Sequence, residues 1–110
     1  ALSSAASDVY KRQGVEGNDI FKLSKKIIGD AGYGDYYNHG LGHGVGIDIH
    51  ELPNFNRSKN TIEIGSVVTM EPGVYLPGVG GVRLEDYGVV TENGYEPFTK
   101  TPHDLHVIDC

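Results

Sequence analysis

Three of the five histidines stand close together among glycines, at His39, His43 and His50 in the run HGLGHGVGIDIHE. Neutral imidazole is the commonest metal-binding side chain in proteins, and it also carries protons near neutral pH. The spacing differs from the helical HExxH motif of zinc peptidases, because glycine disfavours a helix and no Glu follows the first histidine. A single histidine would more often be structural, whereas three interleaved with glycine indicate a chemical site.

Two glutamates follow in strand-like surroundings that predict burial, Glu71 in VVTMEPGVY and Glu85 in GGVRLEDYG. A buried carboxylate is costly unless it is paired or binds a metal. Strand alternation places Glu71 on the same face as Thr69 and places Glu85 beside Arg83. Either glutamate alone would more often lie on the solvent face of a half-exposed sheet. Together with the histidines, the two indicate functional carboxylates.

A helix is expected before the histidine segment, from Asn18 to Ala31. Asn18 is a suitable N-cap, and Gly32 follows the last turn. The apolar residues recur at helical spacing and predict one buried face, made of Ile20, Leu23, Ile27 and Ile28. The segment from Tyr37 to Glu51 shows neither a sustained helical nor a sustained strand period, so its glycines and histidines are expected to serve local chemistry.

The second half of the chain has the pattern of β-strands joined by turns. A loop is expected over the polar run Asn54 to Asn60. Strands are expected at Val67 to Leu76, Val82 to Thr91 and Tyr95 to Thr99, with turns at Pro77 to Gly81 and Glu92 to Gly94. A helix followed by antiparallel strands predicts an α+β fold.

Composition restricts the class of ligand. The 110 residues carry 15 acidic and 9 basic side chains, a net charge of −6, which argues against nucleic-acid binding and against an anionic membrane surface. Small neutral ligands or peptides fit better. The 16 glycines predict tight turns or backbone packed closely around a site.

Cysteine usage and hydropathy bear on location. The single cysteine, Cys110, allows no disulfide within the chain and no cysteine-based zinc site, so a reducing, cytoplasmic compartment is expected. No apolar stretch approaches the roughly 20 residues of a membrane helix, and the first residues lack the order of a signal peptide. A soluble protein without membrane partners is therefore expected.

The first residues do not resemble a natural protein. Ser3 to Gln13 reads SSAASDVYKRQ, which resembles a translated sequencing-library adapter. We therefore expect residues 1–13 to form a non-native tail, with a natural polar N-terminal tail as the alternative, and residues 14–110 to be the part that folds. One small domain, or part of a larger one, is expected at this length.

The runs HGLGHGVGIDIHE, TMEPGVY and GGVRLED resemble, in this order, the Xaa-Pro dipeptidases (prolidases) and Xaa-Pro aminopeptidases, which are relatives of methionine aminopeptidase. The resemblance covers Gly14 to Asp109. It implies the C-terminal portion of a pita-bread fold and hydrolysis of the bond between an N-terminal residue and proline. It also implies two divalent ions, manganese first with cobalt or zinc as alternatives, a peptide substrate with proline second, and compatibility with a homodimer.

The resemblance assigns metal ligands and catalytic residues one by one. His43, Glu71 and Glu85 match the metal-binding His and the two Glu of the family. Glu71 would also carry the proton from the nucleophilic water to the leaving nitrogen. His39 and His50 match histidines that contact the substrate and stabilise the tetrahedral intermediate.

The same resemblance gives roles to two more side chains. Arg83 matches an arginine that pairs with a metal-binding carboxylate, and Tyr75 falls where some members line the substrate pocket. The family's two Asp ligands lie on an upstream strand, which this chain does not supply before His39. We therefore expect a part of the catalytic domain that holds three of five ligands and is inactive alone.

Three alternatives remain at this point. Methionine aminopeptidase has similar His and Glu motifs, although GGVRLED so soon after EPGVY favours the proline-specific branch. A non-catalytic peptide-binding module of the same fold typically loses ligands, whereas His43, Glu71 and Glu85 are all present. A metal-binding β-barrel of the cupin kind needs a His-x-His pair, which the sequence lacks.

Overall fold

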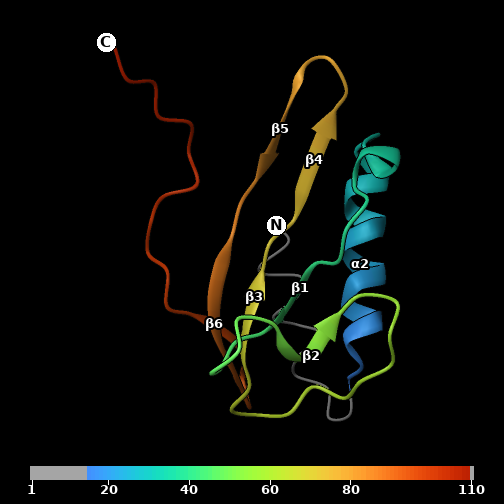
Figure 1. Cartoon of the computed structure of the whole chain (residues 1–110), viewed down its shortest axis with the longest axis vertical. Helices are drawn as coiled ribbons and strands as arrows, with labels where there is room; N and C mark the ends of the chain where they lie inside the picture. Colours follow the sequence, from blue (N-terminus) through green and yellow to red (C-terminus); the bar gives the residue numbers. More distant parts are fainter. Residues whose placement is uncertain (1–14, 110) are drawn as a thin grey trace.

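The computed structural model describes residues 15–109, which form one α-helix, a short 3-10 helix η1 (Gly34–Tyr36) and two antiparallel sheets (Figure 1). The α+β architecture predicted from the sequence is therefore confirmed. The non-native reading of Ser3 to Gln13 lies outside the described residues and stays a prediction, as does a boundary at Gly14.

The main sheet has five strands in the order β2-β1-β3-β6-β7, with every described neighbour antiparallel. Its strands are β1 (Gly42–Gly44), β2 (Glu51–Phe55), β3 (Val67–Met70), β6 (Asp86–Thr91) and β7 (Gly94–Pro97). The β6–β7 turn consists of Glu92 and Asn93, and Gly94 has a positive φ of 128°. Glycine tolerates this conformation without steric cost, and the predicted tight hairpin turn is confirmed.

Two long strands expected from the sequence are each divided in two. The run from Val67 onward breaks after Met70 and resumes as β4 (Gly73–Leu76). The facing run forms β5 (Gly80–Arg83) and resumes as β6. The ribbon β4–β5 is a separate two-stranded sheet that extends beyond β3 and β6 in Figure 1. Both breaks fall at the same level, so Glu71 and Glu85 lie at a junction rather than inside a strand.

The helix α2 (Gly17–Asp30) begins one residue earlier than expected, and its N-cap is Glu16 rather than Asn18. Backbone pairing fixes where the helix begins, because Glu16 forms an antiparallel bridge with Thr61 and the Gly17 amide donates to the Asn60 carbonyl. No side chain caps the helix. Tertiary pairing has therefore replaced the local capping signal.

The core lies between α2 and the sheet. Buried Ile20, Phe21 and Ile28 of α2 pack with residues of the sheet and its connections, whereas Leu23 and Ile27 are only partly buried. Gly17 makes close packing possible, since a Cβ there would lie 2.1 Å from the carbonyl oxygen of Asn54. Among the described residues, no helix has the length and apolar character to span a membrane.

The expected loop from Asn54 to Asn60 was wrong at its beginning. Strand β2 runs through Pro53 to Phe55, and Phe55 is fully buried. The polar run still turns after Asn56, and its end is tied back because the Asn54 amide donates to Asn60 Oδ1 at 2.6 Å. The polar composition of the segment predicted a loop from Asn54 onward. Phe55 is buried instead, and β2 therefore continues to it.

Candidate active site

The junction between the two sheets contains a groove of about 430 Å³. Its lining comes from β1 and the following loop, from both strand breaks and from β3, β5 and β6 beside them. The lining residues are His43, Val45, Ile49, His50, Thr69, Glu71, Arg83, Glu85 and Tyr87. Four of the residues predicted from the sequence to be metal-binding or catalytic, and Arg83, therefore share one surface depression. Residues 43 and 85 are distant in sequence, so the sheet order creates this proximity.

Glycines on both sides of His43 allow β1 to fit tightly between its neighbours. A Cβ at Gly42 would lie 2.1 Å from the carbonyl oxygen of Thr69, and one at Gly44 would lie 2.3 Å from that of Leu52. Real Cβ atoms do not approach so closely, so a larger residue would push β1 away from β3 or β2. The predicted role of glycine in close backbone packing around a site is confirmed at these positions.

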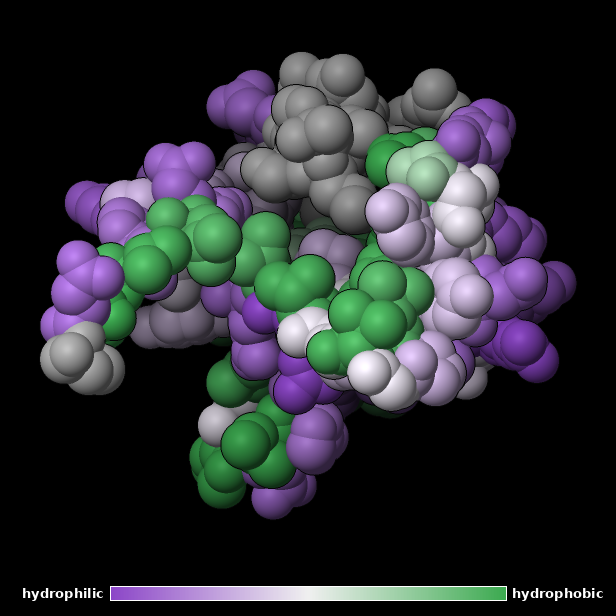
Figure 2. Space-filling view, turned by 90° about the horizontal axis from the view of Figure 1, so that it is seen from above, coloured by the Kyte–Doolittle hydropathy of each residue, from purple (hydrophilic) through white to green (hydrophobic). Residues whose placement is uncertain are grey.

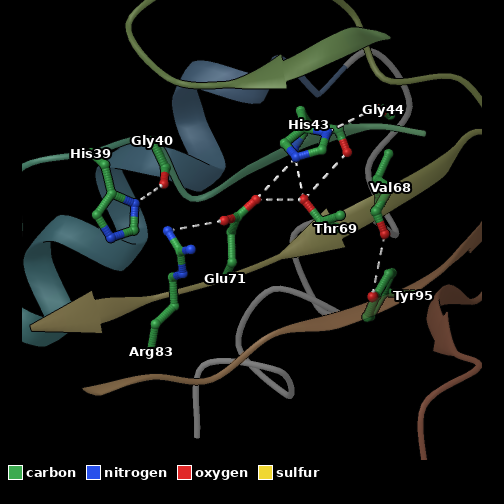
Figure 3. A network of polar contacts seen from close by, with 9 residues as sticks. All are labelled: His39, Gly40, His43, Gly44, Val68, Thr69, Glu71, Arg83 and Tyr95. Carbon is green, nitrogen blue, oxygen red and sulfur yellow. Dashed lines mark hydrogen bonds and ion pairs between the residues drawn. The ribbon is translucent and has the colours of Figure 1, made fainter. Parts of the chain in front are cut away.

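His43 and Glu71 form the centre of the groove (Figure 3), with His43 Nε2 lying 3.2 Å from Glu71 Oε1. The other ring nitrogen, Nδ1, lies 2.9 Å from the carbonyl oxygen of Gly44. A carbonyl only accepts, so Nδ1 carries a proton, and in the neutral ring the lone pair of Nε2 would point toward the carboxylate. Two electron-pair donors that face each other fit a shared cation, either a proton or a metal ion.

Thr69 and Arg83 hold the Glu71 carboxylate from two sides. The Thr69 hydroxyl donates to Glu71 Oε1 at 3.0 Å and accepts the His43 amide proton at 3.0 Å. The Arg83 guanidinium lies 3.6 Å from Glu71 Oε2. Since the Glu71 side chain is only 13% exposed, these partners offset its desolvation and fix its orientation. The predicted alternation of Thr69 and Glu71 on one face is confirmed.

His50 lies at the rim of the groove on the exposed segment between β1 and β2. Its ring packs against that of His43 with centroids 4.3 Å apart and planes at 62°. The neighbouring apolar side chains are strongly exposed, with Ile47 fully accessible. His50 is therefore beside the His43–Glu71 pair but turned toward solvent.

Glu85 differs from the expectation that its strand would bury it. It lies between β5 and β6, where the pairing is interrupted, and its side chain is exposed. Within residues 15–109, no three His, Cys, Asp or Glu side chains converge closely enough to hold a metal ion. The structure thus brings His43 and Glu71 together, while the assignment of Glu85 as a third ligand stays a prediction.

His39 faces a different depression, a pocket of about 710 Å³ that it lines with Tyr37, Lys25 and Arg57. Its ring stands edge-on to Tyr37, with centroids 5.2 Å apart, and to Tyr75, with centroids 5.5 Å apart. The predicted substrate residues therefore form two groups. His50 and Arg83 lie at the groove, while His39 and Tyr75 lie together beside it.

Sequence reasoning missed Tyr37 as part of this second group. Burial raises the pKa of its hydroxyl, a hydrogen bond with Ser24 lowers it, and the negative charge of Glu71 raises it further. The electrostatic influence of Glu71 therefore extends to Tyr37. The sequence offers only the position of Tyr37, two residues before His39. Its role becomes visible once Ser24 of α2 is placed beside it.

The comparison with protein families gives one match, a model of metallopeptidase family M24 over residues 1–92. An Xaa-Pro dipeptidase of Lactobacillus delbrueckii subsp. lactis is 45% identical over 105 residues, which is 94% of this chain and 28% of the relative. The matched family range includes the segment Ser3 to Gln13.

Solved structures are similar over almost the whole chain. An Xaa-Pro dipeptidase from Bacillus anthracis has a TM-score of 0.82 and 40% identity, covering 97% of this chain and 31% of that one. An X-Pro aminopeptidase from Thermotoga maritima has a TM-score of 0.84 and 32% identity, covering 97% and 32%.

These likenesses confirm the predicted pita-bread architecture and the predicted family resemblance. The chain spans less than a third of the length of each of these relatives. Because the family model matches most of its residues and the sheet junction retains the His and Glu of the motif, the chain belongs to metallopeptidase family M24.

Proposed function

We propose that this chain is the part of a dinuclear-metal peptidase that supplies a His ligand and two Glu ligands, and that the enzyme releases an N-terminal residue preceding proline. The observation that carries the proposal is the facing of His43 Nε2 and Glu71 Oε1 at 3.2 Å in the groove. The proline preference is supported by relatives that are named Xaa-Pro dipeptidases.

The donor set fits a divalent cation in part. The Nδ1 proton of His43 is engaged by the Gly44 carbonyl, which leaves Nε2 of the neutral ring as the ligating nitrogen, and this is the usual arrangement of a metal-binding histidine. Glu71 and Glu85 would complete this chain's share. The remaining ligands are proposed to be two Asp side chains from the rest of the polypeptide, and manganese is the proposed ion. Such ions, when bound, lower the pKa of a water molecule and polarise a carbonyl.

Glu71 is proposed to move the proton of the reaction. Its Oε1 is held by the Thr69 hydroxyl and its Oε2 faces Arg83, so the carboxylate is oriented before a substrate arrives. A fixed carboxylate can receive a proton from water and return it to the leaving nitrogen without reorganising. His50, at the rim and against His43, is proposed to donate a hydrogen bond to the developing oxyanion.

His39 and Tyr75 are proposed to contact the peptide beside the scissile bond. Their rings lie together at 5.5 Å, next to the groove rather than inside it. The substrate would therefore extend from the His43–Glu71 pair toward these rings. Neither nucleic acid nor a membrane is proposed as a partner, in agreement with the net charge of −6.

A chimera tests the proposal. Residues 14–109 would replace the matched part of the Lactobacillus Xaa-Pro dipeptidase, which shares 45% identity with this chain. We expect manganese-dependent hydrolysis of Xaa-Pro dipeptides by the folded chimera and none by the 110-residue chain alone. Turnover by the chain alone would contradict the incomplete-site proposal. Preference for Met-Ala over Xaa-Pro peptides would indicate methionine aminopeptidase, and a folded chimera that binds metal without turnover would indicate a peptide-binding module.

A further inference from the structure

The buried ring of Tyr37 connects helix α2 to His39. Tyr37 is fully buried, and its hydroxyl lies 3.1 Å from the hydroxyl of Ser24, which is also fully buried. Ser24 also donates to the Phe21 carbonyl at 2.7 Å, so the Tyr37 hydroxyl joins a hydrogen-bonded chain that ends on the backbone of α2. The ring is thus fixed from the helix side.

Lys25 holds Tyr37 from a second direction. Its ammonium group donates to the Tyr37 carbonyl and lies 4.9 Å from the centroid of the same ring, a cation–π contact. Phe21 packs against the ring at 6.1 Å. Backbone and ring of Tyr37 are therefore both tied to α2, and the residue has little freedom to turn.

His39 rests against this fixed ring. The two rings are perpendicular, at 88°, with centroids 5.2 Å apart, which is a favourable edge-to-face geometry. His39 Nδ1 lies 2.7 Å from the Gly40 carbonyl and so carries the ring proton in the neutral state. Its Nε2 is buried and has no hydrogen-bond partner in the described part of the chain.

The free nitrogen faces Gly73 and Tyr75. A Cβ on Gly73 would lie 2.9 Å from His39 Nε2 and 2.8 Å from the Tyr75 hydroxyl. A side chain at residue 73 would therefore displace at least one of these two polar atoms. A buried acceptor without a partner is costly, so the ring must be held in this orientation by its surroundings.

We propose that Tyr37 is a positioning residue, which fixes the ring orientation and tautomer of His39 through the edge-to-face contact, with α2 as the support. That the oriented His39 serves a peptide substrate depends on the proposed function. The orientation itself does not, and it can be measured in the 110-residue chain without turnover.

The test is long-range ¹H–¹⁵N correlation of the imidazoles in the ¹⁵N-labelled chain at about pH 8, where histidine is neutral. The parent should show His39 with a protonated Nδ1 and an unprotonated Nε2. Tyr37→Leu should move the two His39 nitrogen shifts toward each other, because the tautomers then average. Tyr37→Phe keeps the ring and should restore the parent pattern.

Tyr36→Leu is the matched control, since it makes the same change at the preceding, exposed residue. It should leave His39 unchanged, and the His43 signals should be constant in all variants. If Tyr37→Leu does not fold, Tyr37→Met fills the same space with a flexible apolar chain and makes the same prediction. Averaged tautomers in the parent, or a parent-like His39 in a folded Leu or Met variant, would overturn the proposal. An inactive chimera would instead count against the proposed function alone.

Discussion

The two breaks that face each other between the sheets differ in how far the chain itself prepares them. At the β3–β4 break, Glu71 is 13% exposed and is oriented by Thr69, Arg83 and His43. At the β5–β6 break, Glu85 is exposed and makes no hydrogen bond or ion pair within residues 15–109. Glu71 and Glu85 therefore occupy matching positions at the two breaks but have different surroundings. Glu71 is held by this chain, whereas no contact within residues 15–109 fixes the orientation of Glu85.

The largest expected effect of this difference is kinetic. In the chimera, Glu71→Gln should lower kcat by about 10²–10⁴-fold with a much smaller change in KM, because Gln is nearly isosteric but carries no proton. The measurement is steady-state hydrolysis of an Xaa-Pro dipeptide at saturating manganese. Nearly unchanged kcat would require a different proton carrier.

Glu85→Gln provides the comparison within the same chimera. Its proposed role is to hold the ion, so excess manganese should recover much of its activity, as it should for His43→Ala. Added metal should not recover Glu71→Gln. Equal recovery of all three variants would remove the distinction between the two breaks.

A smaller effect concerns stability. Thr69→Val should lower the free energy of unfolding by about 1–3 kcal/mol, because the His43 amide and the Glu71 carboxylate both lose a partner at a site where Thr69 is 4% exposed. Urea denaturation of the 110-residue chain measures this. Glu85→Gln serves as the control and should stay within about 0.5 kcal/mol, as expected for an exposed substitution. Equal losses would mean that Glu85 is as constrained as Glu71.

The smallest effect is electrostatic. Glu71→Gln should lower the pKa of Tyr37 toward its ordinary value without reaching it, because burial, the main cause of the raised pKa, remains while the negative charge disappears. Glu85→Gln should leave it unchanged. The ¹³Cζ shift of Tyr37 followed through alkaline titration reports the pKa. A larger response to Glu85→Gln would reverse the order of the two carboxylates.

Much of this arrangement could be predicted from the sequence. The helix, the hairpin turn before Gly94 and the proximity of His43 to Glu71 followed from periodicity, turn chemistry and motif resemblance. The strand breaks could not, because continuous β-propensity over residues 67–76 and 82–91 says nothing about where pairing changes partner. Exposure of Glu85 follows from that break.

The N-cap of α2 and the packing of Tyr37 beside His39 could not be predicted from local sequence rules either. Asn18 has the better capping side chain, but the bridge between Glu16 and Thr61 determines where α2 begins. Tyr37 has no recognisable role until Ser24, thirteen residues earlier, is placed beside it. Both depend on contacts between distant parts of the chain, which pattern reading does not supply.

Exposed apolar side chains also distinguish the segments around the groove from the His43–Glu71 pair inside it. Figure 2 shows apolar side chains gathered over the tip of the β4–β5 ribbon and over the loop that follows β1, where Val79 is 83% and Ile49 is 74% exposed. Ile49 of that loop lines the groove, and the Glu71 side chain in the groove is nevertheless well covered. The side chains of His43 and Glu71 are therefore much less exposed than Ile49 at the rim of the groove.

The narrow contact between β1 and β3 has a consequence for how the site opens. The strands share one paired position, Gly44 with Val68. They are otherwise joined by the Val45 amide to Val67, the Glu71 amide to Leu41 and the His43 amide to the Thr69 hydroxyl. Separation along this line would divide His43 from Glu71 while leaving the β3–β6 pairing intact. Local opening with a free energy below that of global unfolding would therefore dismantle the pair first. The exchange rates of the Val45 and Glu71 amides with solvent deuterium directly report how often that separation occurs.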